Sequence, residues 1–243
     1  MPVEFVFAAA VGLCVGSFAN VVTHRLPRSE SVVSPHSHCP GCSMRLKRRD
    51  MIPVISWLLL RGKCRYCEMN ISISYPIAEI VSAGLFVLAA KHTGAALSVL
   101  PLWGLAFVLL CVSVIDWKTM EIPDGLLAVG VISAGLWVGL GGIGWREALL
   151  GAATGALPLF LLDRLIWKLA KKPGFGFGDV KLMAMAGLFL GWQGVPPAFF
   201  TAFVAGGAYG AWLLLSGKAR RGSYLAFGPF LCAGVLVGLL VSR

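Results

Sequence analysis

Apolar segments of nearly membrane-spanning length recur along the whole of this 243-residue chain, separated by short polar connections. A helix needs about 20 predominantly apolar residues to cross a bilayer. The segments cover residues 5–22, 76–90, 95–115, 125–140, 149–166, 180–190, 197–215 and 227–241. This pattern predicts an all-α polytopic membrane protein with about eight transmembrane helices.

The composition supports this interpretation, because 58% of the residues are hydrophobic and only 13% are charged. Soluble domains carry about 25% charged residues. The net charge of +10 would also suit a nucleic-acid-binding protein, but the basic and aromatic residues are not interleaved as in such proteins. In a membrane protein, excess Lys and Arg mark cytoplasmic loops and their contact with anionic lipid. We therefore expect membrane lipid, and no nucleic acid, among the partners.

The distribution of basic residues predicts the orientation. With the N-terminus outside, 18 of the 21 Lys and Arg residues fall on the inner side, as the positive-inside rule requires. Both termini are then outside, and the long loop 23–75 is cytoplasmic. The first apolar segment has Glu4 as its only early charge and lacks the basic start of a signal peptide, so we expect it to remain as a membrane helix.

The long loop contains two Cys-x-x-Cys pairs, Cys39 with Cys42 and Cys64 with Cys67, separated by 21 residues. Four thiolates in two closely spaced pairs are typical of a tetrahedral zinc site. Two disulfides are the alternative, which a reducing cytosol disfavours. His36 and His38 are further candidate ligands. We expect zinc, or a similar structural metal, to fold a loop too polar to form its own core.

Three aspartates lie at the ends of predicted membrane helices. A carboxylate at such a position is costly and is a functional-site hypothesis by default. Asp124 follows Pro123 and Asp179 also begins an apolar segment, so either could cap a helix N-terminus. Asp116 ends the third segment, where the helix dipole disfavours an anion, and the sequence offers no structural reason for it.

Asp116 and Asp179 are predicted to lie at the same depth, at the cytoplasmic boundary. Two carboxylates held close together share a proton. One can then activate a water while the other polarises a peptide carbonyl, which is the chemistry of an aspartic protease. Gly174, Gly176 and Gly178 precede Asp179 and would let a substrate backbone pass close to the acid.

Two other classes of function remain open at this point. A proton-coupled transporter could relay protons through the two acids, but transporters commonly have internal repeats and acids near the midplane. The chain shows no repeat, and both acids are expected at one interface. A purely structural membrane subunit would leave Asp116 unexplained.

The sequence resembles the bacterial type IV prepilin peptidases, which share a Gly-x-Gly-Asp motif with other intramembrane aspartyl proteases. The matching stretches include the four cysteines and are distributed along most of the chain: 16–20, 25–27, 55–58, 61–64, 75–76 with Glu79, 116–124 and 176–182. Ser74 departs from the pattern, because the family has Arg before the Tyr-Pro pair.

This resemblance implies an enzyme of the bacterial inner membrane with two activities. It would remove the basic leader of prepilins or pseudopilins at the cytoplasmic face, with Asp116 and Asp179 as the catalytic pair and Gly176 and Gly178 beside the substrate. It would then methylate the new amino terminus with S-adenosylmethionine. Glu79 is a candidate for the methyl-donor or substrate site, with a helix-packing hydrogen bond as the alternative, and the departure at Ser74 leaves open a peptidase without methyltransferase activity.

The predicted organisation has three parts. Residues 1–22 form the first transmembrane helix, and residues 23–75 form the cytoplasmic loop that would be associated with methyl transfer. Residues 76–243 form the transmembrane protease bundle.

Overall fold

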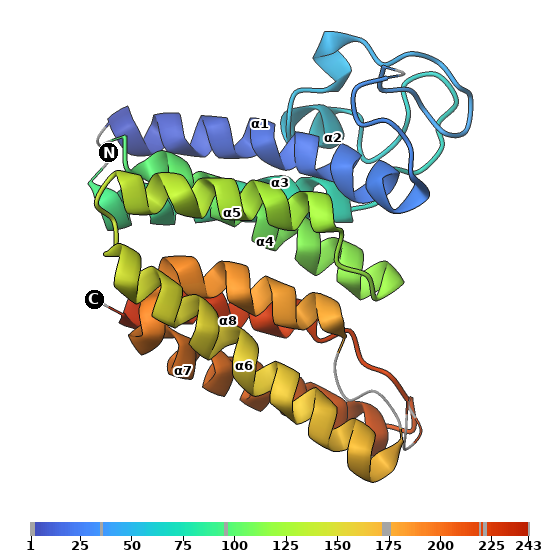
Figure 1. The fold of residues 1–243 in the computed structure, drawn as a ribbon. Coiled ribbons are helices and arrows are strands. Elements are labelled where there is room, and N and C mark those ends of the chain that lie inside the picture. The colour runs from blue at the N-terminus through green and yellow to red at the C-terminus, as the bar shows by residue number, and fades with distance from the viewer. Residues whose placement is uncertain are drawn as a thin grey trace. The chain divides into compact units, whose positions relative to one another are not determined.

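The computed structural model describes residues 3–34, 36–94, 97–171, 176–218, 220 and 223–242. Among these residues the secondary structure is helical, and the only β-type pairings are two isolated bridges. The elements, labelled in Figure 1, are α1 (Val3–Arg25), η1 (Leu26–Arg28), η2 (Arg48–Asp50), α2 (Ile55–Leu59), α3 (Ser74–Thr93), α4 (Val99–Thr119), α5 (Asp124–Gly139), α6 (Trp145–Ala170), α7 (Phe177–Leu215) and α8 (Gly228–Val241). The all-α prediction is confirmed.

Five helices in the described part of the chain are long and apolar enough to cross a membrane, namely α1 with η1, α3, α4, α6 and α7. The apolar helices α5 and α8 are shorter. The 39-residue α7 is interrupted at Gly191, which has φ 64° and ψ 175°. Its two arms correspond to the predicted sixth and seventh segments, so all eight predicted segments are helical. The chain is a multi-pass membrane protein.

The chain reverses direction at Gly191. The second arm begins with Gly194 beside Gly238, near the C-terminal end of α8, and Gly206 further along it lies beside Phe227, just before α8 begins. The second arm is therefore antiparallel to α8. The first arm begins near the α4–α5 connection, where Gly178 faces Ile122. Because the start of α8 also adjoins α4, at Asp116, the two arms of α7 run in opposite directions.

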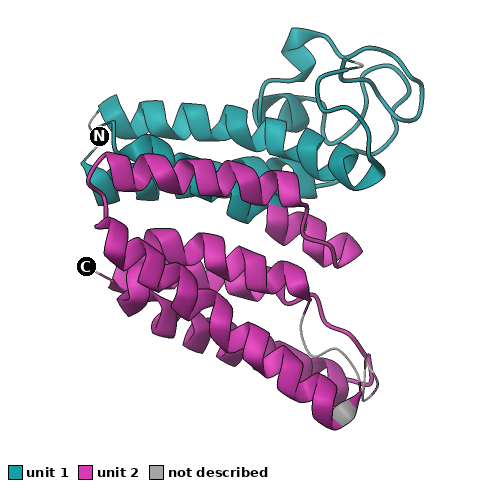
Figure 2. Cartoon of the chain, in the orientation of Figure 1, with its two compact units in different colours: residues 1–111 teal, residues 112–243 magenta. Residues whose placement is uncertain are grey.

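The chain divides into two compact units, residues 1–111 and 112–243 (Figure 2), and the boundary falls within α4. In the first unit, α1 packs on α3 through small residues. A Cβ on Gly12 would lie 2.7 Å from the Cα of Ala83, and one on Gly16 would lie 2.7 Å from the Cα of Glu79. Two backbones this close require glycine at the contact.

The second unit is held together by similar contacts between α6, α7 and α8. A Cβ on Gly151 of α6 would lie 2.1 Å from the carbonyl oxygen of Gly187, and one on Gly155 would lie 2.3 Å from that of Met183. A Cβ on Gly234 of α8 would lie 2.2 Å from the Ala198 carbonyl oxygen. In a bilayer, where apolar side chains gain little by leaving lipid, such close packing is a main source of helix association.

The end of α4 and the first arm of α7 carry several of the most deeply buried side chains in this unit. They include Val112, Ile115, Leu182, Met183 and Met185. These residues lie near Asp116 and Asp179 in sequence, so both carboxylates are carried on closely packed helices.

Candidate functional site

Asp116 lies near the C-terminal end of α4, and its side chain is buried, with 5% of the residue exposed. The backbone N–H of Gly228 donates a hydrogen bond to its Oδ2 at 2.8 Å. Gly228 is the first residue of α8, so this carboxylate meets the positive end of that helix. The expectation that Asp116 has no structural role was wrong, because the helix that it caps begins 112 residues later in the chain.

Asp179 is the third residue of α7 and is equally buried, with 7% of the residue exposed. The backbone N–H of Gly176 donates to its Oδ2 at 3.2 Å, and its own N–H donates to the Gly176 carbonyl at 3.0 Å. These bonds close the first turn of the helix. The capping role considered for Asp179 is therefore present in the structure, and it fixes the direction of the side chain.

The structure brings the two aspartates together. Their carboxylates lie within range of an electrostatic interaction with each other and with the buried thiol of Cys232 on α8. Each carboxylate uses Oδ2 to accept one backbone N–H, and the described residues offer no hydrogen-bond donor to Oδ1 of either. The site is thus a pair of buried acids, each oriented through one oxygen.

Gly228 belongs to this site and was not identified from the sequence. A Cβ at this position would lie 2.7 Å from Oδ2 of Asp116, so a side chain here would displace the carboxylate. The Gly228-Pro229 pair before an apolar run is a recognisable helix start. That signal could have indicated a free backbone N–H, although it does not identify the acceptor.

The predicted substrate-binding glycines lie at the start of α7. A Cβ on Gly178 would lie 3.0 Å from the Cβ of Ile122, so the space beside it holds a residue of this chain. A Cβ on Gly176 would be 3.5 Å from Oδ2 of Asp179, an ordinary contact. Gly174 lies outside the described residues. Contact of substrate with Gly176 and Gly178 stays a prediction.

Asp124, at the first position of α5, forms an ion pair with Lys181 of α7, at 2.7 Å between Oδ1 and Nζ. The Lys181 ammonium also lies 5.1 Å from the ring centroid of Phe177. The Asp124 side chain is 73% exposed. Asp124 therefore ties the start of α5 to the start of α7 and is separate from the buried acid pair.

The two Cys-x-x-Cys segments of the loop have the same local fold. Cys39 donates its N–H to the Met44 carbonyl, and Cys64 donates its N–H to the Met69 carbonyl. The residue after each second cysteine, Ser43 or Glu68, has a positive φ of 56° or 57° and bonds back to the first cysteine. Each segment is therefore a tight turn that points two sulfurs the same way; we call these turns the knuckles.

The four sulfurs of the knuckles lie within 4.8 Å of one another, and those of Cys39 and Cys67 are 3.7 Å apart. A tetrahedral zinc–thiolate site with bonds of about 2.3 Å has sulfurs about 3.8 Å apart, so the arrangement fits a metal ion. Burial raises the pKa of the Cys39 thiol, but the N–H groups of Cys42 and Gly41 and the neighbouring thiols lower it to about 7. All four cysteines are free, and the group does not include His36 or His38.

Glu79 is buried on α3, and its Oε2 accepts the backbone N–H of Val54 at 2.7 Å. Val54 has φ 60° and ψ −50°, and the N–H of Ile55 donates to the Pro53 carbonyl at 2.5 Å. This is a γ-turn of positive φ, which is strained and rare for a β-branched residue. Glu79 thus makes a packing hydrogen bond, the alternative considered from the sequence, and it holds the cysteine loop against α3.

The fold and these sites define a helical multi-pass membrane protein with a buried pair of aspartates and a four-cysteine loop. Residues 10–93 match the model of the bacterial peptidase A24 N-terminal domain, and residues 103–211 match that of the type IV leader peptidase family. The chain belongs to the type IV leader peptidase family.

Relatives from distant bacteria match nearly the whole chain. The prepilin leader peptidase/N-methyltransferase of Stutzerimonas stutzeri is 37% identical, over 98% of this chain and 91% of the relative. Proteins of the same name from Burkholderia pseudomallei (strain 1026b) and Bacillus subtilis (strain 168) are 36% and 35% identical, covering 95% and 94% of this chain and 83% and 91% of the relatives. No solved structure gives a significant match.

Proposed function

We propose that this protein is a prepilin leader peptidase and N-methyltransferase that uses Asp116 and Asp179 as its catalytic pair. The observation that carries the proposal is the pair of buried carboxylates, each held through Oδ2 by a backbone N–H at a helix N-terminus. Family membership and the names of the relatives support the same activity.

The geometry suits hydrolysis by general acid–base catalysis. The ionised carboxylate takes a proton from a water as that water attacks the scissile carbonyl carbon, and the protonated partner donates a hydrogen bond to the carbonyl oxygen. The tetrahedral intermediate then collapses, the C–N bond breaks, and the leaving amine takes up a proton from the acid pair. No covalent intermediate forms on the enzyme. We assign these roles to the Oδ1 atoms, which accept no hydrogen bond from the described residues.

The cysteine loop is proposed to bind one zinc ion through Cys39, Cys42, Cys64 and Cys67. A bound metal would supply the cross-link that holds the two knuckles together. Between residues 26 and 73, the buried residues among those described are Cys39, Gly62 and Cys64. The loop therefore lacks an apolar core of its own, and this supports a structural function for the metal.

Methyl transfer is proposed with S-adenosylmethionine as the donor, on the basis of the family and the names of the relatives. The part of this chain proposed to take part is the first unit, in which Glu79 holds the strained turn at Val54. Glu79 would act by positioning this segment. The donor supplies the methyl group, and the acceptor is the amino terminus that cleavage exposes.

The proposed substrates are prepilins or pseudopilins, whose basic leader precedes an apolar helical segment. That segment would lie in the bilayer, so that the scissile bond reaches the acid pair at the cytoplasmic face of the bacterial inner membrane. The one-sided distribution of Lys and Arg supports this orientation. Gly176 and Gly178 are proposed to lie beside the substrate backbone.

The proposal is tested by incubating membranes that contain this protein with a prepilin and S-adenosylmethionine. Mass spectrometry of the product reports leader loss and the gain of one methyl group separately. We expect both, in that order. Leader loss without methylation would support the alternative of a peptidase alone, and an intact prepilin would contradict the proposal.

A further inference from the structure

The cysteine loop carries an exposed apolar surface between its two knuckles. Five large apolar residues form it, with exposed fractions from 41% for Met51 to 78% for Leu59. We call these residues the loop patch: Met51, Ile52, Ile55, Leu58 and Leu59. A cluster of exposed large apolar residues marks a surface that binds a partner or a membrane.

Three residues of the loop patch lie on one face of α2, and Met51 and Ile52 precede this helix. Residues 55, 58 and 59 lie on the same side of a helix because of its 3.6-residue repeat. Trp57 points the other way, where its indole N–H donates to the Ile71 carbonyl at 3.0 Å and its ring contacts Gly62. Trp57 therefore fixes α2 to the body of the loop and leaves the loop patch outward.

The loop patch is held beside a membrane helix. Its neighbour Val54 is bonded to Glu79 at 2.7 Å, and Glu79 lies five residues into α3, which is long and apolar enough to span a membrane. Five residues correspond to roughly 7.5 Å along a helix axis. The start of α2 is therefore tied to α3 at a level beyond the first turn of the spanning helix, which brings the loop patch to the depth of the membrane surface.

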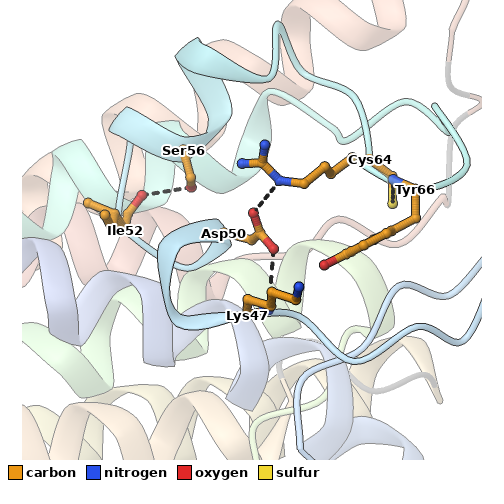
Figure 3. Close-up of polar contacts among 7 residues, drawn as sticks. Lys47, Asp50, Ile52, Ser56, Cys64 and Tyr66 are labelled. Atoms are coloured by element: carbon orange, nitrogen blue, oxygen red, sulfur yellow. Dashed lines mark hydrogen bonds and ion pairs between the residues drawn. The ribbon is translucent and has the colours of Figure 1, made fainter.

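Basic residues flank the loop patch on both sides. Arg48 and Arg49 precede it, Arg61 and Lys63 follow it, and all four are exposed. The single acid between residues 47 and 63 is Asp50, which forms an ion pair with Arg65 at 2.7 Å (Figure 3). The rim of the loop patch therefore keeps a net positive charge, and an apolar face with a basic rim is the pattern of segments that lie in an anionic lipid surface.

We propose that the loop patch is a membrane-surface anchor, which lies at the boundary between headgroups and acyl chains while its basic rim contacts anionic phospholipid headgroups. The anchor holds the cysteine loop against the bilayer beside α3. The proposal rests on the membrane placement of α3 and is independent of the peptidase activity, so either can fail alone.

The test uses the full-length protein in lipid nanodiscs, with a fluorescent amino acid in place of Leu59. The nanodiscs contain phospholipid that carries a nitroxide quencher high on the acyl chain. Met44, an apolar residue on the first knuckle that is 49% exposed, is replaced in the same way as the matched control. We expect quenching at position 59 to exceed that at position 44 by roughly threefold or more, since an interfacial segment sits within the acyl boundary.

The contribution of charge is tested by repeating the measurement in zwitterionic lipid and with the double variant Arg48→Gln/Arg49→Gln. Each basic residue near an anionic surface favours binding, so we expect the docked fraction at position 59 to fall in both cases. Equal quenching at positions 59 and 44 would overturn the proposal. The proposal would also be overturned if a photoreactive group at position 59 crosslinked to residues 112–243 or to a second copy of the chain and not to lipid.

Discussion

The cysteine loop and the helical bundle of residues 112–243 are stabilised in opposite ways. In the bundle, helices touch through glycines, as where a Cβ on Gly151 would lie 2.1 Å from the Gly187 carbonyl oxygen. In the part of the loop between residues 26 and 73, Cys39, Cys64 and Gly62 are the buried residues among those described. The difference indicates that the bundle depends on backbone proximity, whereas the loop depends on a few polar cross-links and on its four thiols.

The division matters for function because the two proposed activities rely on different parts. The acid pair is carried on α4 and α7, and its orientation depends on helix N-termini in the bundle. The proposed zinc site and Glu79 belong to the first unit. Changes in one region should therefore leave the other largely intact, and the following predictions test that separation from the largest expected effect to the smallest.

Asp116→Asn and Asp179→Asn should each reduce leader cleavage by at least roughly 10³-fold, because neither variant retains a pair that can exchange a proton. An Asn side chain can still accept the Gly228 or Gly176 N–H, so the bundle should stay folded and the metal content unchanged. The measurement is the rate of prepilin cleavage. Asp124→Asn is the matched control and should keep most activity, since its ion pair is exposed; an inactive Asp124→Asn beside an active Asp116→Asn would contradict the assignment.

Cys39→Ser and Cys64→Ser should each lower the metal content from about one ion per chain and unfold the loop, because metal binding and folding are coupled in such sites. Metal analysis and the alkylation rate of the remaining loop thiols measure this. Cleavage should survive in part. Cys14→Ser, outside the loop, is the control. If all four loop thiols of the wild-type protein were freely alkylated under native conditions, the proposed metal site would be contradicted.

Gly151→Ala should destabilise the bundle by about 1–3 kcal/mol or more, because the added Cβ forces α6 away from α7. Gly135→Ala is the opposite case, since no atom lies within 4 Å of a Cβ there. It should stabilise α5 by up to about 1 kcal/mol through helix propensity. Thermal unfolding in nanodiscs measures both changes: we expect a lower unfolding temperature for Gly151→Ala and a higher one for Gly135→Ala. Equal shifts would show that the close contact at Gly151 is absent.

Glu79→Ala should leave the Val54 N–H without its partner at a cost of about 1–3 kcal/mol, the range for an unsatisfied hydrogen-bond donor. The strained turn should then relax, and amide hydrogen exchange across residues 54–59 should accelerate. Glu79→Gln keeps an acceptor and should be milder. We expect methylation to suffer more than cleavage in both variants. Unchanged exchange in Glu79→Ala would contradict the positioning role.

Asp50→Asn should have the smallest effect, about 1 kcal/mol or less, because the Arg65 side chain is 37% exposed. Burial raises the pKa of Asp50, but the hydrogen bonds from Arg65 and from the Lys47 N–H lower it by a larger amount. The pKa of Asp50 in the folded protein therefore lies below the ordinary 3.8. The stabilisation is therefore present above pH 3.8 and lost as the pH falls through the lower, folded value. Amide exchange of residues 47–50 in the variant and the wild type should differ at neutral pH and converge in acid.

The linear pattern of the chain was enough to predict the helices, because membrane insertion demands long apolar segments whatever their partners are. Even the two arms of α7 were separate segments in the sequence, and the eight-helix topology already required the chain to turn back between them; the backbone at Gly191 shows the residue at which it does so. The four-cysteine cluster could be predicted for a related reason. Its two pairs are local, and each knuckle needs only a tight turn to bring two sulfurs together.

Contacts between residues distant in sequence were decided by the tertiary structure. The Gly228 N–H reaches Asp116 across 112 residues, and Glu79 reaches back 25 residues to Val54. The donor that pairs with each carboxylate could not be predicted from the carboxylate's own segment. A free backbone N–H, such as one at a helix N-terminus, bonds to whichever carboxylate the packing brings near. The membrane helices and the four-cysteine cluster thus follow from the residue types and their spacing, whereas the partner of each buried carboxylate depends on how distant segments pack together.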